Sequence, residues 1–358
     1  MSDIYAVILC GGRGERFWPK SRQNLPKQFV RLFARHSLTK ATSDRIKRLC
    51  PLERQLFVAP EQFVGLLKTE IPVAPDNLIL EPVGKNTAPA IGLAAITISQ
   101  RAPEGIMVVL PADHLIAPTA EFLKALRIGV ELAQNGWLVT FGITPTRPDT
   151  NYGYIQLGEE LIRRKNLVAY RVKEFKEKPN SRTARRYIDS QRYLWNSGMF
   201  VWRVDLILQE FARFMPKFYE GLIAYNQLRS TQESRETVKR LYQRVEAISI
   251  DYAVMEKAAD VAVVHGRFDW DDVGSWLALA RRLPVDKYGN THQGVWFERD
   301  THNSIIYSDE GVVATLGIRN LVIARSGEAV LVADKQALGE LRQLLREMQA
   351  DPKGRKFL

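Results

Sequence analysis

The chain has 358 residues, of which 46% are hydrophobic, and this is enough to bury a sizeable core and excludes a disordered chain. Its formal net charge is +11, but the basic residues form no block of about five or more like charges and accompany no RNA or DNA motif, so small anionic substrates are expected rather than nucleic acid. Two cysteines make no disulfide framework and no apolar run approaches the ~20 residues of a membrane span, so we expect a cytoplasmic protein without a membrane partner.

The first predicted element is a buried parallel strand over residues 4–9, an apolar run too short for a signal peptide. Gly11, Gly12 and Gly14 follow at once. Glycine permits a positive φ and lets backbone N–H groups approach an anion closely. Because cations surround these glycines, the loop is typical of a polyphosphate site. The cations are Arg13, Arg16, Lys20, Arg22 and Lys27.

Two familiar phosphate loops are excluded. The string G-x-x-x-x-G-K-[ST] of the P-loop is absent. The dinucleotide fingerprint fails because Phe17 stands where its third glycine belongs, and no acidic residue follows at the expected distance. A bare glycine loop would favour a plain turn with solvated arginines, but the adjoining Trp18-Pro19 and Pro26-Lys27-Gln28 segments favour a functional loop.

The string GGRGERFWPKSR, followed by PKQF, resembles the signature of the sugar-nucleotide pyrophosphorylases and, within them, of the bacterial mannose-1-phosphate guanylyltransferases. Cys10 replaces a usually small residue and Phe17 a usual leucine; both are apolar and are expected to be tolerated. The resemblance implies that the loop amides and Arg16 hold the departing phosphates, while Lys27 neutralises charge at the α-phosphate. The nucleotide-binding residues implied for this loop are Gly11, Gly12, Arg13, Gly14, Arg16 and Lys27.

Helix and strand signals alternate after the loop, which predicts a parallel sheet covered on both faces, with ligands beyond the carboxyl ends of its strands. The expected fold class is α/β: a nucleotidyltransferase domain of glycosyltransferase-A type with a Rossmann-like mixed or parallel sheet. The predicted helices cover residues 37–49 and 61–69, and the predicted strands cover 55–59 and 77–80.

The segment EPVGKNTAPAI over residues 81–91 leads into a predicted helix that ends at Ser99. Asn86 or Thr87 can cap this helix, and a cap alone would explain both residues. The string also resembles the nucleotide-binding segment of the family, which implies that Asn86 and Thr87 contact the base and ribose.

A predicted apolar strand over residues 106–110 ends in Pro111-Ala112-Asp113-His114. A carboxylate at a strand end can hold Mg²⁺, although a lone aspartate there is more often a turn or helix cap. The PADH string resembles the family's metal motif, which implies that Asp113 binds both metal and nucleotide. His114 is interpreted as structural, and no histidine spacing indicates zinc.

Two motifs follow on the predicted sugar side. After a helix (121–134) and a strand (137–142), the loop 144–158 places Gly153 between two tyrosines, where it could equally be a bulge. A strand over 168–175 then leads into Glu177 and Lys178, which would ordinarily be a solvated turn. The resemblance implies that the backbone at Gly153 and the side chain of Glu177 contact the sugar, and that Lys178 contacts the sugar phosphate.

Asn196 and Ser197 interrupt the aromatic run over residues 193–201, where burial without partners would be costly. They either hydrogen-bond in a local turn or face the sugar, and the WNSGMF string favours Asn196 as a hydroxyl ligand. A helical segment over 205–245 is expected to cover this side. Asp251 is interpreted either as a helix cap or as a residue that shapes the sugar site.

The string FDWDDVGSW over residues 268–276 supplies a second carboxylate, Asp272, which the resemblance implies shares one metal with Asp113; Asp271 is the less favoured partner. Turn formers fill residues 284–294, and short β runs and a helix over 335–348 follow. The expected division is a catalytic domain (1–283), a linker (284–294) and a small domain (295–358) that the resemblance implies is a left-handed β-helix.

The resemblance implies transfer of GMP from GTP to mannose 1-phosphate with Mg²⁺, which gives GDP-mannose and pyrophosphate. The attacking sugar phosphate is already ionised, so alignment and charge neutralisation suffice. The alternatives are another sugar 1-phosphate (glucose or a heptose) or a non-catalytic GDP-mannose sensor, and a homodimer is compatible with the sequence. The implied catalytic residues are Arg16, Lys27, Asp113 and Asp272.

Overall fold

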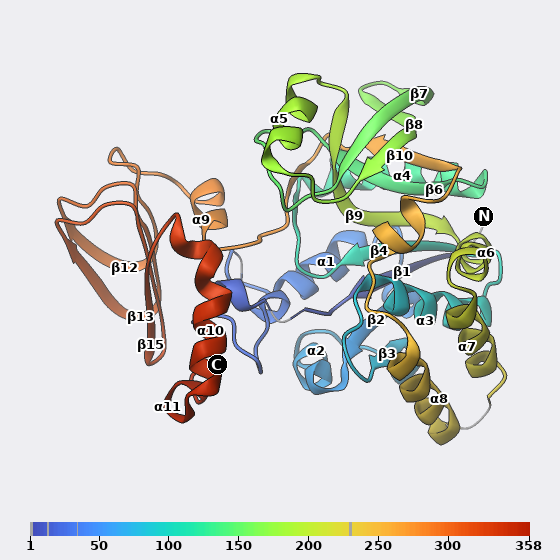
Figure 1. Cartoon of the computed structure of the whole chain (residues 1–358), viewed down its shortest axis with the longest axis horizontal. Coiled ribbons are helices and arrows are strands. Elements are labelled where there is room, and N and C mark those ends of the chain that lie inside the picture. Colours follow the sequence, from blue (N-terminus) through green and yellow to red (C-terminus); the bar gives the residue numbers. More distant parts are fainter. Residues whose placement is uncertain (1–2, 13, 34, 229–230) are drawn as a thin grey trace. The chain divides into compact units, whose positions relative to one another are not determined.

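The structure is a computed structural model that describes residues 3–12, 14–33, 35–228 and 231–358 (Figure 1). The chain forms two compact units. The first contains Met1–Gly11 and Thr39–Trp270, and the second contains Gly12–Leu38 and Asp271–Leu358. The domain boundary expected at residue 283 and the linker expected over 284–294 stay predictions.

The first unit is built on a nine-stranded sheet with the order β3-β2-β1-β4-β9-β6-β10-β8-β7. The strands β1, β2, β3 and β4 are parallel neighbours, and β6 pairs with β10 in parallel, whereas β9, β8 and β7 run antiparallel to their neighbours. This confirms the mixed sheet. The strands are β1 (Ile4–Leu9), β2 (Gln55–Pro60), β3 (Leu78–Glu81), β4 (Ile106–Pro111), β6 (Leu138–Ile143), β7 (Tyr154–Arg164), β8 (Leu167–Lys176), β9 (Tyr193–Arg203) and β10 (Val261–His265).

Both faces of the sheet are covered. In β1, Tyr5 and Val7 join the core cluster that contains helix α3, while the alternate residues Ala6 and Ile8 are equally buried on the opposite face. Helix α3 approaches α7 so closely that a Cβ at Gly92 would collide with Phe218. The helices are α1 (Leu38–Ile46), α2 (Val64–Glu70), α3 (Thr87–Ser99), α4 (Thr119–Gln134), α5 (Ser181–Asp189), α6 (Val204–Phe214), α7 (Pro216–Asn226) and α8 (Thr231–Arg244).

Several elements differ from the sequence prediction. Strand β7 begins at Tyr154, inside the predicted loop, and runs on through a polar half that is largely exposed, which hid it from hydrophobic periodicity. Strand β9 runs through Asn196 and Ser197, so the local turn that the sequence allowed at these residues is not formed. The predicted helical segment 205–245 is three helices, and Pro216 starts the second of them.

The second unit contains a four-stranded sheet with the order β12-β13-β14-β15. Parallel neighbours in a flat sheet need a long crossover, yet β12, β13 and β14 are parallel and joined by short loops, as in a β-helix. β14 and β15 are antiparallel. The strands are β12 (Thr291–Arg299), β13 (Ile305–Leu316), β14 (Leu321–Ser326) and β15 (Ala329–Asp334), and the helices are α9 (Leu277–Arg282), α10 (Leu341–Ala350) and α11 (Pro352–Arg355).

Strand β12 begins four residues earlier than expected, within the predicted linker. The helix predicted over 335–348 is α10, which begins at Leu341 after a 3₁₀ turn. Two short strands, β5 (Leu115–Ala117) and β11 (Asp269–Asp271), complete the set. Among the helices described, none combines the length and the apolar character that crossing a membrane requires.

Candidate active site

The glycine loop requires glycine at two of its positions. Gly12 and Gly14 have φ values of 90° and 60°, in the region where a Cβ is strained. A Cβ at Gly14 would also collide with Lys27, whereas the space around Gly11 is open. Arg16 lies in a 3₁₀ turn over Glu15–Phe17 and is partly exposed, and Arg13 lies outside the described residues.

The second unit brings Lys27 and the backbone of Asp272 together. Lys27 is only 6% exposed, and its Nζ donates to the carbonyl oxygens of Asp272 at 2.6 Å and of Val273 at 3.1 Å. Two of the residues expected to be catalytic are therefore neighbours, although 245 positions separate them in the sequence.

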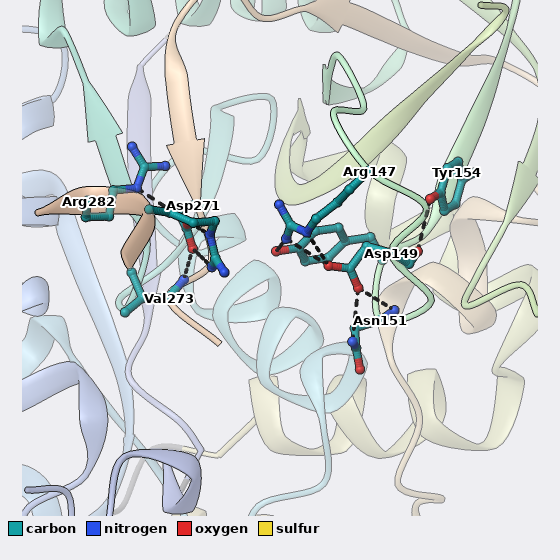
Figure 2. A network of polar contacts seen from close by, with 9 residues as sticks. Arg147, Asp149, Asn151, Tyr154, Asp271, Val273 and Arg282 are labelled. Atoms are coloured by element: carbon teal, nitrogen blue, oxygen red, sulfur yellow. Dashed lines mark hydrogen bonds and ion pairs between the residues drawn. The ribbon is translucent and has the colours of Figure 1, made fainter. Parts of the chain in front are cut away.

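A strained turn presents these carbonyl oxygens. Val273 has φ +48°, which is an outlier for a β-branched residue. The buried carboxylate of Asp271 accepts the N–H of Val273 at 2.8 Å, two bonds from Arg281 at 2.8 and 2.9 Å, and one from Arg282 at 3.3 Å (Figure 2). Burial alone would raise the pKa of Asp271, but the hydrogen bonds and charge of Arg281 hold it below its usual value. Asp271 therefore braces the turn.

Asn86 caps helix α3, as the sequence predicted. Its side-chain oxygen accepts the N–H of Thr87 at 2.9 Å, and its φ of 71° is unusual for a residue other than glycine. The hydroxyl of Thr87 accepts the N–H of Ile250 at 2.8 Å. The N-terminus of α3, whose partial positive charge favours anions, is thus tied to the segment that carries Asp251.

Asp113 lies two residues after the end of strand β4, and its side chain is 31% exposed. Its neighbour His114 is buried, and the Nδ1 atom of His114 accepts the indole N–H of Trp270 at 3.2 Å, which fits a structural role. Across the described part of the chain, no three His, Cys, Asp or Glu side chains gather at one point. Asp113 belongs to the first unit and Asp272 to the second, and their meeting at one ion stays a prediction.

A polar cluster in the first unit is centred on Asn196. The side-chain nitrogen of Asn196 donates to Asp251 at 2.8 Å, and its side-chain oxygen accepts the hydroxyl of Thr140 at 2.9 Å and the N–H of Gly198 at 3.2 Å. The backbone N–H of Asn196 donates to the carbonyl oxygen of Gly153 at 2.8 Å. Thr140 was not selected from the sequence, because a threonine within a strand carries no signal of its own.

Glu177 and Lys178 complete this cluster. A Cβ at Gly153 would collide with Glu177 Oε2, and within the described part of the chain this buried oxygen has no hydrogen-bond partner. The Nζ of Lys178 lies 3.1 Å from the other carboxylate oxygen of Glu177. Burial raises the pKa of Glu177, and the nearby charge of Asp251 raises it further. Burial also raises the pKa of Asp251, against the lowering effect of Asn196.

The predicted loop before Gly153 is braced by hydrogen bonds that the sequence did not reveal. The carboxylate of Asp149 accepts two bonds from Arg147, at 2.8 and 3.0 Å, and two from Asn151 at 3.0 Å, while the hydroxyl of Tyr154 donates to the carbonyl oxygen of Asp149 at 3.0 Å (Figure 2). The guanidinium of Arg147 lies over the ring of Trp195, 5.0 Å from its centroid. Aspartate two residues before asparagine is a recognisable turn signal that could have indicated this brace.

Two of the five cations near the glycine loop are held by the C-terminal strands of the second unit. Lys20 pairs with Asp309 at 2.8 Å, and Arg22 donates to the carbonyl oxygen of Ser326 at 3.0 Å. The sequence placed Lys20 and Arg22 among the cations of a polyphosphate site, whereas in the structure both bind groups of the C-terminal strands.

Known proteins resemble the chain over nearly its full length. The Nucleotidyl transferase family matches residues 5–284, and the MannoseP isomerase/GMP-like beta-helix domain matches residues 298–348. The mannose-1-phosphate guanylyltransferase of Klebsiella pneumoniae is 40% identical over 95% of this chain and 73% of its own length. The enzyme of the same name from Escherichia coli K12 is 37% identical over 98% of this chain and 74% of its own.

A solved structure from Thermus thermophilus, titled mannose-1-phosphate geranyltransferase, has a TM-score of 0.87 and 38% identity, and covers 97% of this chain and 99% of that one. These likenesses confirm the α/β nucleotidyltransferase fold with a β-helix-like C-terminal part. The chain belongs to the nucleotidyl transferase family and, within it, to the mannose-1-phosphate guanylyltransferases.

Proposed function

We propose that this enzyme transfers GMP from GTP to mannose 1-phosphate and releases GDP-mannose and pyrophosphate. Membership of the guanylyltransferase family supports the reaction. The observation that carries the sugar assignment is the cluster in the first unit. Residues spread over about a hundred positions meet there, and a buried carboxylate oxygen has no hydrogen-bond partner among the residues that the structure describes. The residues are Gly153, Glu177, Lys178, Asn196 and Asp251.

The chemistry of this cluster suits a sugar phosphate. A buried, unpartnered polar atom costs about 1–3 kcal/mol, so Glu177 Oε2 is best explained by a bond that a ligand completes. Carboxylates accept sugar hydroxyls, and the amide of Asn196 presents both a donor and an acceptor. Lys178 is the cation that we assign to the sugar phosphate.

The reaction needs no general base, because the phosphate oxygen that attacks GTP is already ionised at neutral pH. Its rate then depends on in-line alignment and on neutralising the charge that builds up at the α-phosphate and the departing pyrophosphate. We assign the departing phosphates to Arg16 and the amides of Gly11, Gly12 and Gly14, and a further contact with the nucleotide to Arg13. The carbonyl oxygens of Asp272 and Val273 orient Lys27 Nζ, which we assign to the α-phosphate.

We assign base and ribose contacts to Asn86 and Thr87 at the N-terminus of α3. Nucleotidyltransferases of this family generally use a divalent metal, and we propose Mg²⁺. Its preference for a few carboxylates together with phosphate oxygens fits Asp113, which is partly exposed at a strand end, and Asp272. When bound, such an ion neutralises phosphate charge and helps to orient the substrates.

Three further features belong to this proposal. A relative from Xanthomonas campestris, 36% identical over 98% of this chain, is named Xanthan biosynthesis protein XanB, which supports a role in making precursors of polysaccharides. We also propose a cytoplasmic location, where GTP is available, and a homodimer as the form to test by light scattering.

A pyrophosphate-release assay tests the proposal on a grid of four nucleoside triphosphates and the 1-phosphates of mannose, glucose and a heptose. We expect the highest kcat/KM with GTP and mannose 1-phosphate. A higher value for another sugar would reassign the substrate. Release with no pair, combined with tight binding of GDP-mannose, would identify a sensor instead.

A further inference from the structure

The glycine loop from Gly12 onward, together with the residues up to Leu38, belongs to the same compact unit as the C-terminal strands. Residues Gly12–Leu38 group with Asp271–Leu358 rather than with the strand that precedes them. The family matches, by contrast, divide the chain near residues 284–298.

Lys20 is anchored on the β-helix-like strands. Its Nζ lies 2.8 Å from Asp309 Oδ2, and the hydroxyl of Ser326 donates to the same oxygen at 2.7 Å. The ammonium group also lies 5.9 Å from the ring centroid of Tyr307. Both members of the ion pair are largely shielded, with side chains 19% and 23% exposed. The ammonium group of Lys20 is therefore already paired with the carboxylate of Asp309.

Neighbouring residues are anchored from other directions within the unit. The indole of Trp18 donates to the carbonyl oxygen of Phe357 at 2.9 Å, and the indole of Trp276 donates to the carbonyl oxygen of Trp18 at 2.9 Å. The ring of Trp276 packs between Phe17 and Tyr307, with centroids 5.2 and 5.0 Å apart. The backbone from residue 17 to 22 is thus fixed by β13, by β14 and by the C-terminal tail.

We propose that Lys20 and Asp309 form a positioning pair that fixes the glycine loop for GTP, and that Lys20 is not a phosphate ligand. Glycine-rich backbone loses more conformational freedom on ordering than other backbone, so an anchor that orders the loop in advance strengthens nucleotide binding. The C-terminal strands then support the nucleotide site. This inference rests on the proposed function for its substrate, GTP.

The test is a double-mutant cycle in the full chain, using Lys20→Ala, Asp309→Ala and the double variant, with pyrophosphate release as the assay. Each single variant is expected to raise the KM for GTP about fivefold, a typical effect for a partly shielded ion pair. The double variant should be no worse than either single, because the pair acts as one unit. The KM for mannose 1-phosphate, whose proposed residues lie in the first unit, should not change.

Arg319→Ala is the matched control, because it removes the cation of an exposed ion pair with Asp300 in the same unit, and we expect no change in either KM. Thermal unfolding with and without GTP shows whether each variant is folded and how strongly the nucleotide stabilises it. If Lys20→Ala is far worse than Asp309→Ala and the two effects add, Lys20 contacts phosphate and the inference is wrong. Unchanged GTP affinity in all three variants also overturns it. An inactive wild-type enzyme would instead refute the proposed function.

Discussion

The side-chain amide of Asn196 donates to the carboxylate of Asp251 at 2.8 Å, across 55 positions of sequence. The same amide oxygen accepts from Thr140, and the backbone N–H of Asn196 holds the carbonyl oxygen of Gly153. Asn196 therefore fixes two other residues of the proposed sugar site, and it has a defined orientation before any ligand binds.

Asn196→Ala should raise the KM for mannose 1-phosphate about 10- to 100-fold, because it removes a ligand to a hydroxyl and leaves the Asp251 carboxylate without its amide donor. The KM for GTP should stay within about twofold. Steady-state kinetics with each substrate varied in turn measure both constants. Thr140→Val is the control, since it removes a single bond to the amide oxygen, and a smaller effect is expected. Equal increases in the two KM values would contradict the sugar assignment.

The sequence predicted the sheet well where its strands are buried on both faces. Strands β1 and β4 are continuous apolar runs. Gly11 lies just beyond the end of β1, and Pro111 ends β4, so nearby residues indicate both the strands and where they end. The distal half of β7 is polar and exposed, and β9 carries Asn196 in the middle of an aromatic run. Both segments are strands because they pair with neighbouring strands, and this pairing cannot be seen in their own residues.

The candidate site was predictable as a set of residue types but not as an arrangement. Lys20 and Lys27 are both cations that follow the glycine loop, and only the family resemblance singled out Lys27 as catalytic. Their environments differ because Asp309, 289 positions away, pairs with one, while the carbonyl oxygens of a strained turn hold the other. The strain itself was also hidden, because in Asp272-Val273-Gly274 the glycine, not the valine, is the residue expected to take a positive φ.

Lys27→Ala should lower kcat about 10²–10³-fold and weaken GTP binding far less, because a cation at the α-phosphate acts mainly on charge that develops in the transition state. Pre-steady-state or steady-state pyrophosphate release gives kcat, and equilibrium binding of GTP without the sugar phosphate gives the affinity. A mutant that keeps near-normal turnover would show that Lys27 only supports the turn at Asp272 and Val273.

The brace around Asp271 allows a comparison of two adjacent arginines. Arg281 makes two bonds to Asp271 at 2.8 and 2.9 Å, whereas Arg282 makes one at 3.3 Å. Arg281→Ala should therefore lower the free energy of unfolding by about 2 kcal/mol, and Arg282→Ala by less than about 1 kcal/mol, because only the first removes a bidentate partner from a buried carboxylate. Thermal and denaturant unfolding measure both, and the reverse order would contradict the proposed brace.

Glu81 gives the protein a pH-dependent term in its stability. It is the last residue of β3 and is 5% exposed, and burial raises its pKa from 4.5 to about 7 even though a bond from the Tyr242 hydroxyl at 3.1 Å lowers it. Between pH 4.5 and about 7 the folded state therefore holds a proton that the unfolded state has released. Stability must then fall as pH rises through this window, since the folded state binds more protons.

Glu81→Gln should abolish this term, because glutamine has a similar shape and no charge. The free energy of unfolding of the wild type should fall by up to about 3 kcal/mol relative to the variant between pH 4.5 and 7, as follows from a shift of this size. Denaturant titrations at half-unit pH intervals measure the difference. Tyr242→Phe removes the bond that favours the charged carboxylate, so it should move the window to higher pH. Superimposable profiles for the wild type and Glu81→Gln would mean that Glu81 is ionised in the folded protein, and that water or a rearranged neighbour solvates its charge.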